Sequence, residues 1–240
     1  DVVVCGGGPA GIGAAIEAAR SGAKVVLVEH AGFLGGTWTA GLLGVMLDYK
    51  EKTGLMRELK DTLTARKWRN TTVWTDELFT FDVERMKLLL DELCAEHKVD
   101  VLLYTSVVDA IVERGRITHI VTESKSGREA IAGKIFIDAT GDGDVAALSG
   151  CGYDWGNEEG HTQPMSMLGV VTGARFDEIK DCVLWGPEKS RRTSKRSLIA
   201  EIRRSGLETS YKMPCLFLLH DDLYALMATH QYGGRSIATI

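Results

Sequence analysis

The feature that most constrains the fold is the opening stretch DVVVCGGGPAGIGAAIEAARSGAKVVLVE. Residues 2–4 are an uninterrupted β-branched run, which predicts a buried strand, and residues 25–28 predict a second one. Between them, residues 9–21 carry apolar side chains on one helical face and end before Gly22, which predicts a helix. Because a strand–helix–strand unit of this length is a crossover connection, the two strands should be parallel neighbours. The sequence therefore predicts an α/β fold with a parallel sheet.

Three glycines follow the first predicted strand with the spacing GxGxxG: Gly6, Gly8 and Gly11. Gly6 permits a tight turn, Gly8 lets the backbone approach a pyrophosphate, and Gly11 lets helix and strand pack closely. The pyrophosphate would lie at the helix N-terminus, where free N–H groups and the helix dipole favour an anion. Glu29 ends the second strand, where it could accept hydrogen bonds from ribose hydroxyls. We therefore expect a Rossmann-like dinucleotide site, in preference to a structural glycine turn with a solvated Glu29.

The rest of the first 150 residues extends this domain. Helices are predicted at 55–66 and 81–97, and strands at 101–104, 107–113, 117–123 and 134–138. The segments 107–113 and 117–123 are separated by a short polar turn and read as a β-hairpin. We expect this hairpin to form a layer inserted before the last parallel strand.

NAD and FAD share the GxGxxG fingerprint, so other segments must distinguish them. AGFLGG follows Glu29 closely and allows a second close backbone approach to a long ligand. DATGDGD ends a later buried strand, at the edge where a sheet of this kind presents its ligand. In this order, GGGPAG, Glu29, AGFLGG and FIDATGDGD resemble the FAD-dependent oxidoreductase family of the glutathione-reductase-like superfamily. The resemblance implies FAD as the cofactor and an enzyme that is an oxidoreductase.

The resemblance also implies which residues hold FAD. The pyrophosphate and ribose contacts fall on the first turn and Glu29, and Gly35, Gly36 and Thr37 line the path toward the flavin. Backbone groups of Val108, or less favourably Val107, meet the adenine. Asp142 and Asp144 are supports or helix caps. The full predicted set is Gly6, Gly8, Pro9, Ala10, Gly11, Glu29, Gly35, Gly36, Thr37, Val108, Ala139, Thr140, Gly141 and Asp142.

The residue pattern of the sequence changes after Gly152. We expect an FAD-binding domain over residues 1–152 and part of a substrate domain over 153–240. In the second part, strands are predicted within 163–173 and 214–220, and helices at 198–205 and 221–230. The basic run KSRRTSKRS at 189–197 is expected to be a solvated loop, with binding of a substrate carboxylate or phosphate as the alternative.

Composition and charge exclude several classes of protein. The net charge is −5, which argues against nonspecific nucleic-acid binding. Five cysteines without CxxC spacing argue against a disulfide framework or a zinc site, so no metal is expected. No apolar run approaches the roughly 20 residues needed to span a bilayer. These features favour a cytoplasmic protein, although the chain begins at Asp1 and leaves a removed export signal open.

The leading hypothesis is an FAD-dependent oxidoreductase that moves a hydride or an electron pair between a small organic substrate and the flavin. One alternative is a flavin-binding electron-transfer subunit without its own substrate site, and another is an NAD-binding module. His161 is a candidate proton donor, although a surface or satisfied histidine is favoured. His220 with its acidic neighbours is a candidate metal site, although helix capping by Asp221 is favoured. The sequence identifies no catalytic residue. The resemblance implies a closing strand and helix that residues 1–240 do not show, so we expect either a fragment of a longer protein or a remodelled region.

Overall fold

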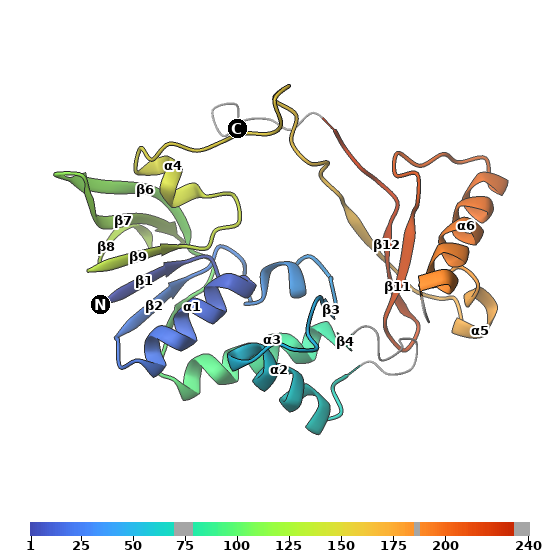
Figure 1. The fold of residues 1–240 in the computed structure, drawn as a ribbon, viewed down its shortest axis with the longest axis horizontal. Helices are drawn as coiled ribbons and strands as arrows, with labels where there is room; N and C mark the ends of the chain where they lie inside the picture. Colours follow the sequence, from blue (N-terminus) through green and yellow to red (C-terminus); the bar gives the residue numbers. More distant parts are fainter. Residues whose placement is uncertain (70–78, 185–187, 233–240) are drawn as a thin grey trace. The chain divides into compact units, whose positions relative to one another are not determined.

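The computed structural model describes residues 1–69, 79–184 and 188–232, and the chain divides into two compact units (Figure 1). Unit 1 comprises Asp1–Leu43 and Val83–Tyr153, and unit 2 comprises Gly44–Asp82 and Asp154–Ile240. The predicted boundary after residue 152 lies one residue before Tyr153, where the chain passes from unit 1 into unit 2 for the last time. The segment Gly44–Asp82 lies within the first predicted domain and groups with unit 2. The assignment of a substrate domain to 153–240 stays a prediction.

A four-stranded parallel sheet forms the centre of unit 1. Its strand order is β5-β2-β1-β9, with β1 at Val2–Cys5, β2 at Val25–Val28, β5 at Asp100–Leu102 and β9 at Ile135–Asp138. The crossover from β1 to β2 is helix α1 at Pro9–Arg20. The predicted Rossmann-like fold with neighbouring parallel strands is therefore confirmed.

The two faces of this sheet are covered differently (Figure 1). Helices α1 and α3 (Val83–Glu96) cover one face. An antiparallel meander covers the other, made of β6 (Ser106–Glu113), β7 (Arg116–Ser124) and β8 (Gly127–Ala132). The core beneath the meander contains Val3, Cys5, Val28, Ile120 and Val145. Side chains alternate along a strand, so β1 and β2 place apolar side chains on both faces of the sheet, against the helices on one face and the meander on the other.

The meander confirms the predicted hairpin and adds a third strand that the sequence reading missed. The segment that forms β8 has only partial alternation, and most of its residues are exposed. It pairs with β7 from Ser124↔Gly127 to His119↔Ala132. β8 is therefore defined by its pairing with β7, and its own residue pattern does not predict a strand.

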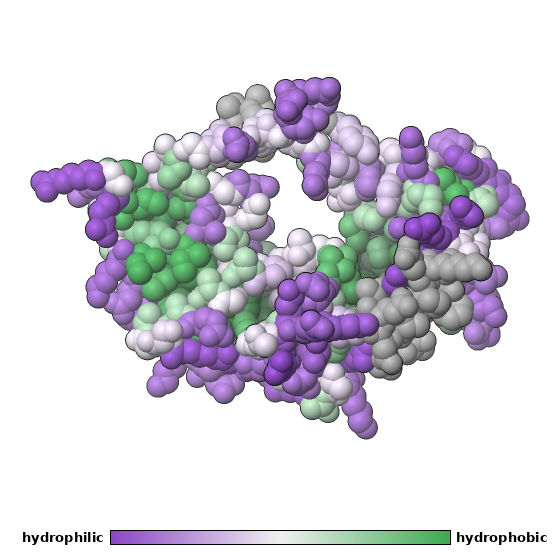
Figure 2. Space-filling view, viewed as in Figure 1, coloured by the Kyte–Doolittle hydropathy of each residue, from purple (hydrophilic) through white to green (hydrophobic). Residues whose placement is uncertain are grey.

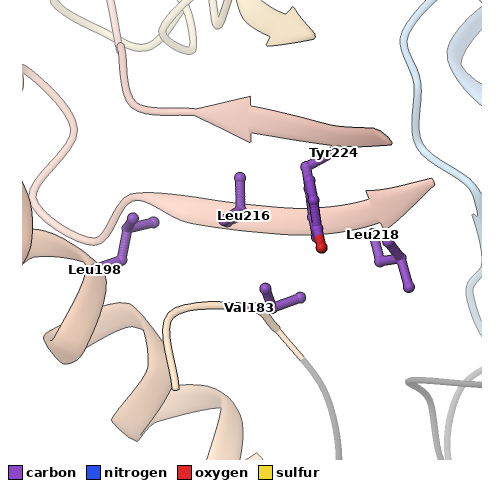
Figure 3. Packing of buried hydrophobic residues seen from close by; sticks show 5 residues of the cluster. All are labelled: Val183, Leu198, Leu216, Leu218 and Tyr224. Carbon is purple, nitrogen blue, oxygen red and sulfur yellow. The ribbon is translucent and has the colours of Figure 1, made fainter. Parts of the chain in front are cut away.

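Unit 2 contains an antiparallel sheet of order β10-β12-β11, at Leu168–Val171, Leu223–Met227 and Cys215–His220. It also contains α2 (Gly54–Ala65), α5 (Phe176–Ile179), α6 (Glu188–Arg204) and the strand pair β3 (Val45–Met46) and β4 (Phe79–Thr80). Figure 3 shows a buried cluster between β11, β12 and α6, made of Val183, Leu198, Leu216, Leu218 and Tyr224. This cluster fixes α6 against the sheet.

The predicted helix at 221–230 is wrong, because this segment contains strand β12. Asp221 adopts a left-handed conformation with φ of 46°. Aspartate tolerates that conformation better than most residues, and it closes the turn between β11 and β12. Pairs such as Leu216↔Leu226 and Phe217↔Ala225 then extend the hairpin. The apolar spacing that suggested a helix is thus satisfied by strand pairing.

The predicted solvated loop at 189–197 is also wrong, because α6 runs through it. Lysine and arginine are good helix formers, so a basic run does not oppose a helix. Ser194 and Leu198 are buried at 3% and 8% exposure, and Ile202 packs against the same cluster. This spacing of four residues marks the inward helical face, while Arg192 and Arg196 are exposed.

Figure 2 shows polar residues over much of the visible surface, with apolar residues gathered over the strands of unit 1. Ile135 in β9 is 57% exposed. Among the described residues, β9 pairs with β1 alone, so β9 is an edge of the sheet. No helix in the described ranges is both long and apolar enough to cross a membrane.

Candidate dinucleotide site

A cavity of about 580 Å³ lies within unit 1, at the carboxyl ends of β1, β2 and β9. This edge of a parallel sheet is the usual place for a ligand. The volume lies in the range typical of ligand pockets. The lining residues are Gly6, Gly8, Pro9, Ala10, Val28, Glu29, His30, Ala31, Gly36, Thr37, Ala40, Thr105, Ser106, Val107, Ala139, Thr140, Gly141, Asp142 and Asp144.

The glycine turn is built from close backbone approaches. Gly6 has φ of +100°, and a Cβ there would lie 2.2 Å from the carbonyl oxygen of Ala139. A Cβ on Gly11 would lie 1.7 Å from the carbonyl oxygen of Gly6. No side chain fits at either distance, so both positions require glycine. The predicted roles of Gly6 in the turn and Gly11 in helix packing agree with this geometry.

The N-terminus of α1 opens onto the cavity. Gly8 is the N-cap and Pro9 is the first helical residue, where a missing N–H costs nothing. A Cβ on Gly8 would meet only the Cα of Gly36, at 3.9 Å, so its α-carbon faces open space. The first-turn N–H groups have no helical acceptor, and the helix dipole adds partial positive charge. This end of the cavity is therefore suited to a phosphate group.

Glu29 is buried at 4% exposure and holds two backbone segments together. One carboxylate oxygen, Oε2, accepts a hydrogen bond from the Gly7 N–H at 2.6 Å. The other, Oε1, accepts one from the Ala31 N–H at 2.7 Å and lies 2.9 Å from Nδ1 of His30. Glu29 thus couples the glycine turn to the end of β2. A carboxylate accepts up to about four hydrogen bonds, so it keeps capacity for a ribose hydroxyl.

The AGFLGG loop packs directly on the glycine turn. The Gly35 N–H donates to the Gly7 carbonyl at 2.8 Å, and the Thr39 hydroxyl donates to the Leu34 carbonyl at 2.6 Å. Gly36 has φ of +51°, and a Cβ there would lie 2.8 Å from the Cα of Gly8. The two glycine-rich segments therefore form adjacent walls of one cavity.

Asp138 organises the third wall, which is the loop of ATGDGD. Its Oδ1 accepts hydrogen bonds from the N–H and hydroxyl of Thr140, at 3.1 and 2.7 Å. Its Oδ2 accepts one from the Ala146 N–H at 2.9 Å, and the Thr140 hydroxyl accepts one from the Asp144 N–H. The first turn of helix α4 (Asp144–Leu148) is thus satisfied by Asp138 and Thr140.

Asp142 and Asp144 both line the cavity. The N-cap of α4 is Gly143, which has no side-chain cap, so the alternative that either aspartate caps this helix is wrong. Burial raises the pKa of Asp144, with the charges of Asp142 and Asp138 adding to the rise and His30 opposing it. Both aspartates therefore contribute to the charge of the cavity wall.

Most of the predicted cofactor residues come together in this cavity. Gly11, Gly35 and Val108 do not line it: the first two shape its walls, and Val108 lies at a β-bulge in β6. Val107, the less favoured adenine contact, does line it. The direct role of each residue in binding FAD stays a prediction.

The sequence reading missed His30, Ala31, Thr105 and Ser106, which also line the cavity. His30 and Ala31 could have been found from their position directly after Glu29. Thr105 precedes β6 and Ser106 is its first residue, so both reach the cavity only through sheet pairing. Thr105 N–H donates to the Glu29 carbonyl at 3.0 Å.

The histidine candidates of unit 2 lie on its surface. The His161 side chain is 70% exposed, with Nδ1 3.4 Å from Glu159. The His220 side chain is 42% exposed, with Nδ1 3.6 Å from Asp221. Within the described ranges, no group of three or more His, Cys, Asp or Glu residues is arranged to hold a metal ion. A proton-donor role for His161 stays a prediction.

The cavity wall combines a glycine turn, a helix N-terminus and a buried carboxylate. These are the features that a Rossmann-like fold uses for a pyrophosphate and a ribose. Cys5 ends β1 beside the glycine turn, but burial raises the pKa of its thiol to about 12, with Asp138 adding to the rise. Its thiol therefore stays protonated at neutral pH and is a poor nucleophile.

Curated relatives match a little over half of the chain. Thiamine thiazole synthase of Methanococcus maripaludis is 30% identical over 151 residues, covering 59% of this chain and 55% of that protein. The enzyme of the same name from Methanococcus vannielii is 30% identical over 151 residues, covering 59% and 56%. The chain spans about half the length of the curated relatives it matches.

Solved structures and a protein family extend the likeness over nearly the whole chain. A geranylgeranyl bacteriochlorophyll reductase-like protein from Thermoplasma acidophilum is 14% identical, with a TM-score of 0.59, over 96% of this chain and 56% of that one. L-proline dehydrogenase from P. horikoshii is 13% identical, with a TM-score of 0.57, over 96% and 70%. At such identities the structures show a shared fold. The FAD dependent oxidoreductase family matches residues 1–225, so this chain belongs to that family of enzymes, whose cofactor is FAD.

Proposed function

We propose that this chain is the cofactor-binding part of an oxidoreductase that transfers a hydride or an electron pair between a small organic substrate and FAD. The observation that carries the proposal is that the α1 N-terminus, buried Glu29 and the Thr140–Asp142 loop meet in one cavity of unit 1. When bound, FAD supplies a ring that accepts and releases an electron pair. The chain supplies binding, orientation and electrostatics.

Different lining residues would bind different parts of FAD. The N–H groups at the start of α1 are suited to binding the pyrophosphate, and Glu29 is suited to accepting a ribose hydroxyl. The backbone near Val107 would meet the adenine. Gly36 and Thr37 lie on the adjacent wall and would direct the remainder of the cofactor beyond the glycine loop. The substrate is expected to be a small molecule bound next to that end.

The first experiment identifies the cofactor. The protein that carries this chain is purified, heated to release the cofactor, and analysed by chromatography. We expect one FAD per chain. Recovery of NAD without flavin would favour the NAD-binding alternative and contradict the proposal.

A second experiment tests the activity. The flavin absorbance is followed without oxygen while small organic hydride donors are added one at a time. Bleaching by a small molecule alone would support an oxidoreductase with its own substrate site. Bleaching that requires a reduced protein partner, and never a small molecule, would favour the electron-transfer subunit instead.

A further inference from the structure

Helix α3 contacts the AGFLGG loop through a single lysine. The Nζ of Lys87 on α3 lies over the ring of Phe33 in the loop, 3.9 Å from the ring centroid. Lys87 also donates a hydrogen bond to Oε1 of Glu84, at 2.7 Å, from the same helix. An ammonium group in this position is attracted by the negative face of the aromatic ring. Lys87 thus joins the loop after β2 to a helix that comes much later in the sequence.

The exposure of Lys87 separates this contact from an ordinary surface ion pair. Glu84 and Lys87 are three residues apart on α3, and an exposed pair at that spacing contributes little to stability. The Lys87 side chain is only 21% exposed, however, whereas the Glu84 side chain is 60% exposed. Lysine is among the side chains that are least often buried. Lys87 is therefore turned inward toward the loop, and Glu84 restrains its ammonium group there.

The residues after Phe33 connect this contact to the cavity wall. Leu34 is fully buried against the glycine turn, because a Cβ on Gly7 would lie 2.7 Å from Leu34 Cδ2. The Gly35 N–H donates to the Gly7 carbonyl at 2.8 Å. Residues 36–37 then line the cavity. The loop is therefore attached to the glycine turn at Leu34 and Gly35, and to α3 one residue earlier.

We infer that Lys87 is a positioning residue of the cofactor site, which holds Phe33 so that residues 36–37 keep their place in the cavity wall. The inference rests on the proposed function, in which this wall directs the flavin half of FAD. Lys87 is not among the residues that line the cavity, so it acts through the loop. The adenosine diphosphate half would meet the α1 N-terminus and Glu29 instead. A change at Lys87 should therefore alter FAD binding and spare ADP, which lacks the flavin half.

The Lys87→Met variant removes the charge and keeps an unbranched apolar side chain. We expect its affinity for FAD to fall about five-fold, as for the loss of one partly buried cation–π contact, while its affinity for ADP changes less than about two-fold. Lys87→Arg keeps a cation that can lie over a ring, so it should restore most of the FAD affinity. This rescue would not be expected if only the bulk of the lysine stem mattered.

Calorimetry on the full-length protein that carries this chain measures both affinities. Phe33→Leu removes the ring and keeps an apolar side chain, so it deletes the same contact from the other side. The double variant with Lys87→Met should therefore lose no more FAD affinity than either single variant. The matched control is Lys134→Met, which removes another ion-paired lysine of unit 1 and should bind FAD as the wild type does.

Three outcomes would overturn the role of Lys87. They are an unchanged FAD affinity in Lys87→Met, losses that multiply in the double variant, and equal losses of FAD and ADP affinity, which indicate a general weakening of unit 1. Should Lys87→Met fail to fold, Phe33→Leu provides the same comparison of FAD with ADP. If the wild-type protein bound no FAD, the proposed function itself would fail, and this role with it.

Discussion

Unit 1 and unit 2 are held together by different means. In unit 1, backbone segments approach one another at glycines, and buried or clamping carboxylates such as Glu29 and Asp138 accept several N–H groups each. In unit 2, an apolar cluster that includes Leu216 and Tyr224 packs α6 against the sheet. The first arrangement allows few substitutions because backbone has no room to move. The second depends on filled volume, which related side chains can replace.

The largest effect should come from Gly11→Ala. Its Cβ would overlap the carbonyl oxygen of Gly6, so α1 must move away from β1, at a cost of about 3 kcal/mol or more. We expect unit 1 to lose its cooperative thermal transition and FAD binding. The matched control is Gly13→Ala on the same helix, where a Cβ meets no atom within 4 Å. This variant should gain about 0.5–1 kcal/mol of stability from helix propensity. Equal behaviour of the two variants would contradict the close-approach explanation.

Leu216→Ala tests the apolar cluster of unit 2. Removing this buried side chain should cost about 3 kcal/mol through lost burial and a cavity. Chemical denaturation followed by hydrogen exchange would locate the loss in β11, β12 and α6. We expect the affinity for FAD to change little. A large loss of FAD affinity would show that the stability of unit 2 affects FAD binding by unit 1.

Glu29→Ala should weaken both the fold of unit 1 and its binding of FAD. The Gly7 and Ala31 N–H groups lose a charged acceptor, which costs about 2 kcal/mol. We expect a greater loss in FAD affinity than in thermal stability, because a ribose hydroxyl would lose the same acceptor. Calorimetry and thermal unfolding measure the two quantities. Unchanged FAD affinity at constant salt would remove Glu29 from the cofactor site.

The smallest effect is expected from Tyr224→Phe, which should stabilise unit 2. The Tyr224 hydroxyl is buried and has no hydrogen-bond partner among the described residues, and burial raises its pKa. Removing an unsatisfied buried hydroxyl should gain about 1 kcal/mol. Denaturant unfolding measures the gain, with Tyr232→Phe, at an exposed position of unit 2, as the control. A loss of stability would mean that the hydroxyl has a partner that the described contacts omit.

The sequence was most informative where one short segment determines its own structure. The βαβ unit could be predicted because the glycine spacing, the helix stop and Glu29 all lie within thirty residues. The site could be predicted to the same extent, through its glycine turn and the ATGDGD loop. His30 could have been placed there too, because it directly follows Glu29, whereas Thr105 and Ser106 reach the cavity only through sheet pairing.

Errors concentrated where pairing or packing decides the structure. Residues 223–227 carry apolar spacing compatible with either a helix or a strand, and the turn at Asp221 settles the choice. The basic run before Leu198 contains no signal for the start of a helix, so the predicted helix began ten residues late. In both cases the partner surface lies elsewhere in the chain, beyond the reach of local propensity.

The position of β1 between β2 and β9 has a consequence for protein synthesis. β2 follows β1 within a single crossover, but the other partner is Ile135–Asp138, paired as Val2↔Ile135. At roughly 5–20 residues per second, a ribosome takes on the order of ten seconds after β1 to deliver that strand. During this time one edge of β1 has no native partner, and the glycine turn lacks the Ala139 wall. The nascent chain therefore completes its nucleotide site late, and slower decoding between residues 29 and 135 would lengthen the period in which an unpaired apolar edge needs chaperone protection.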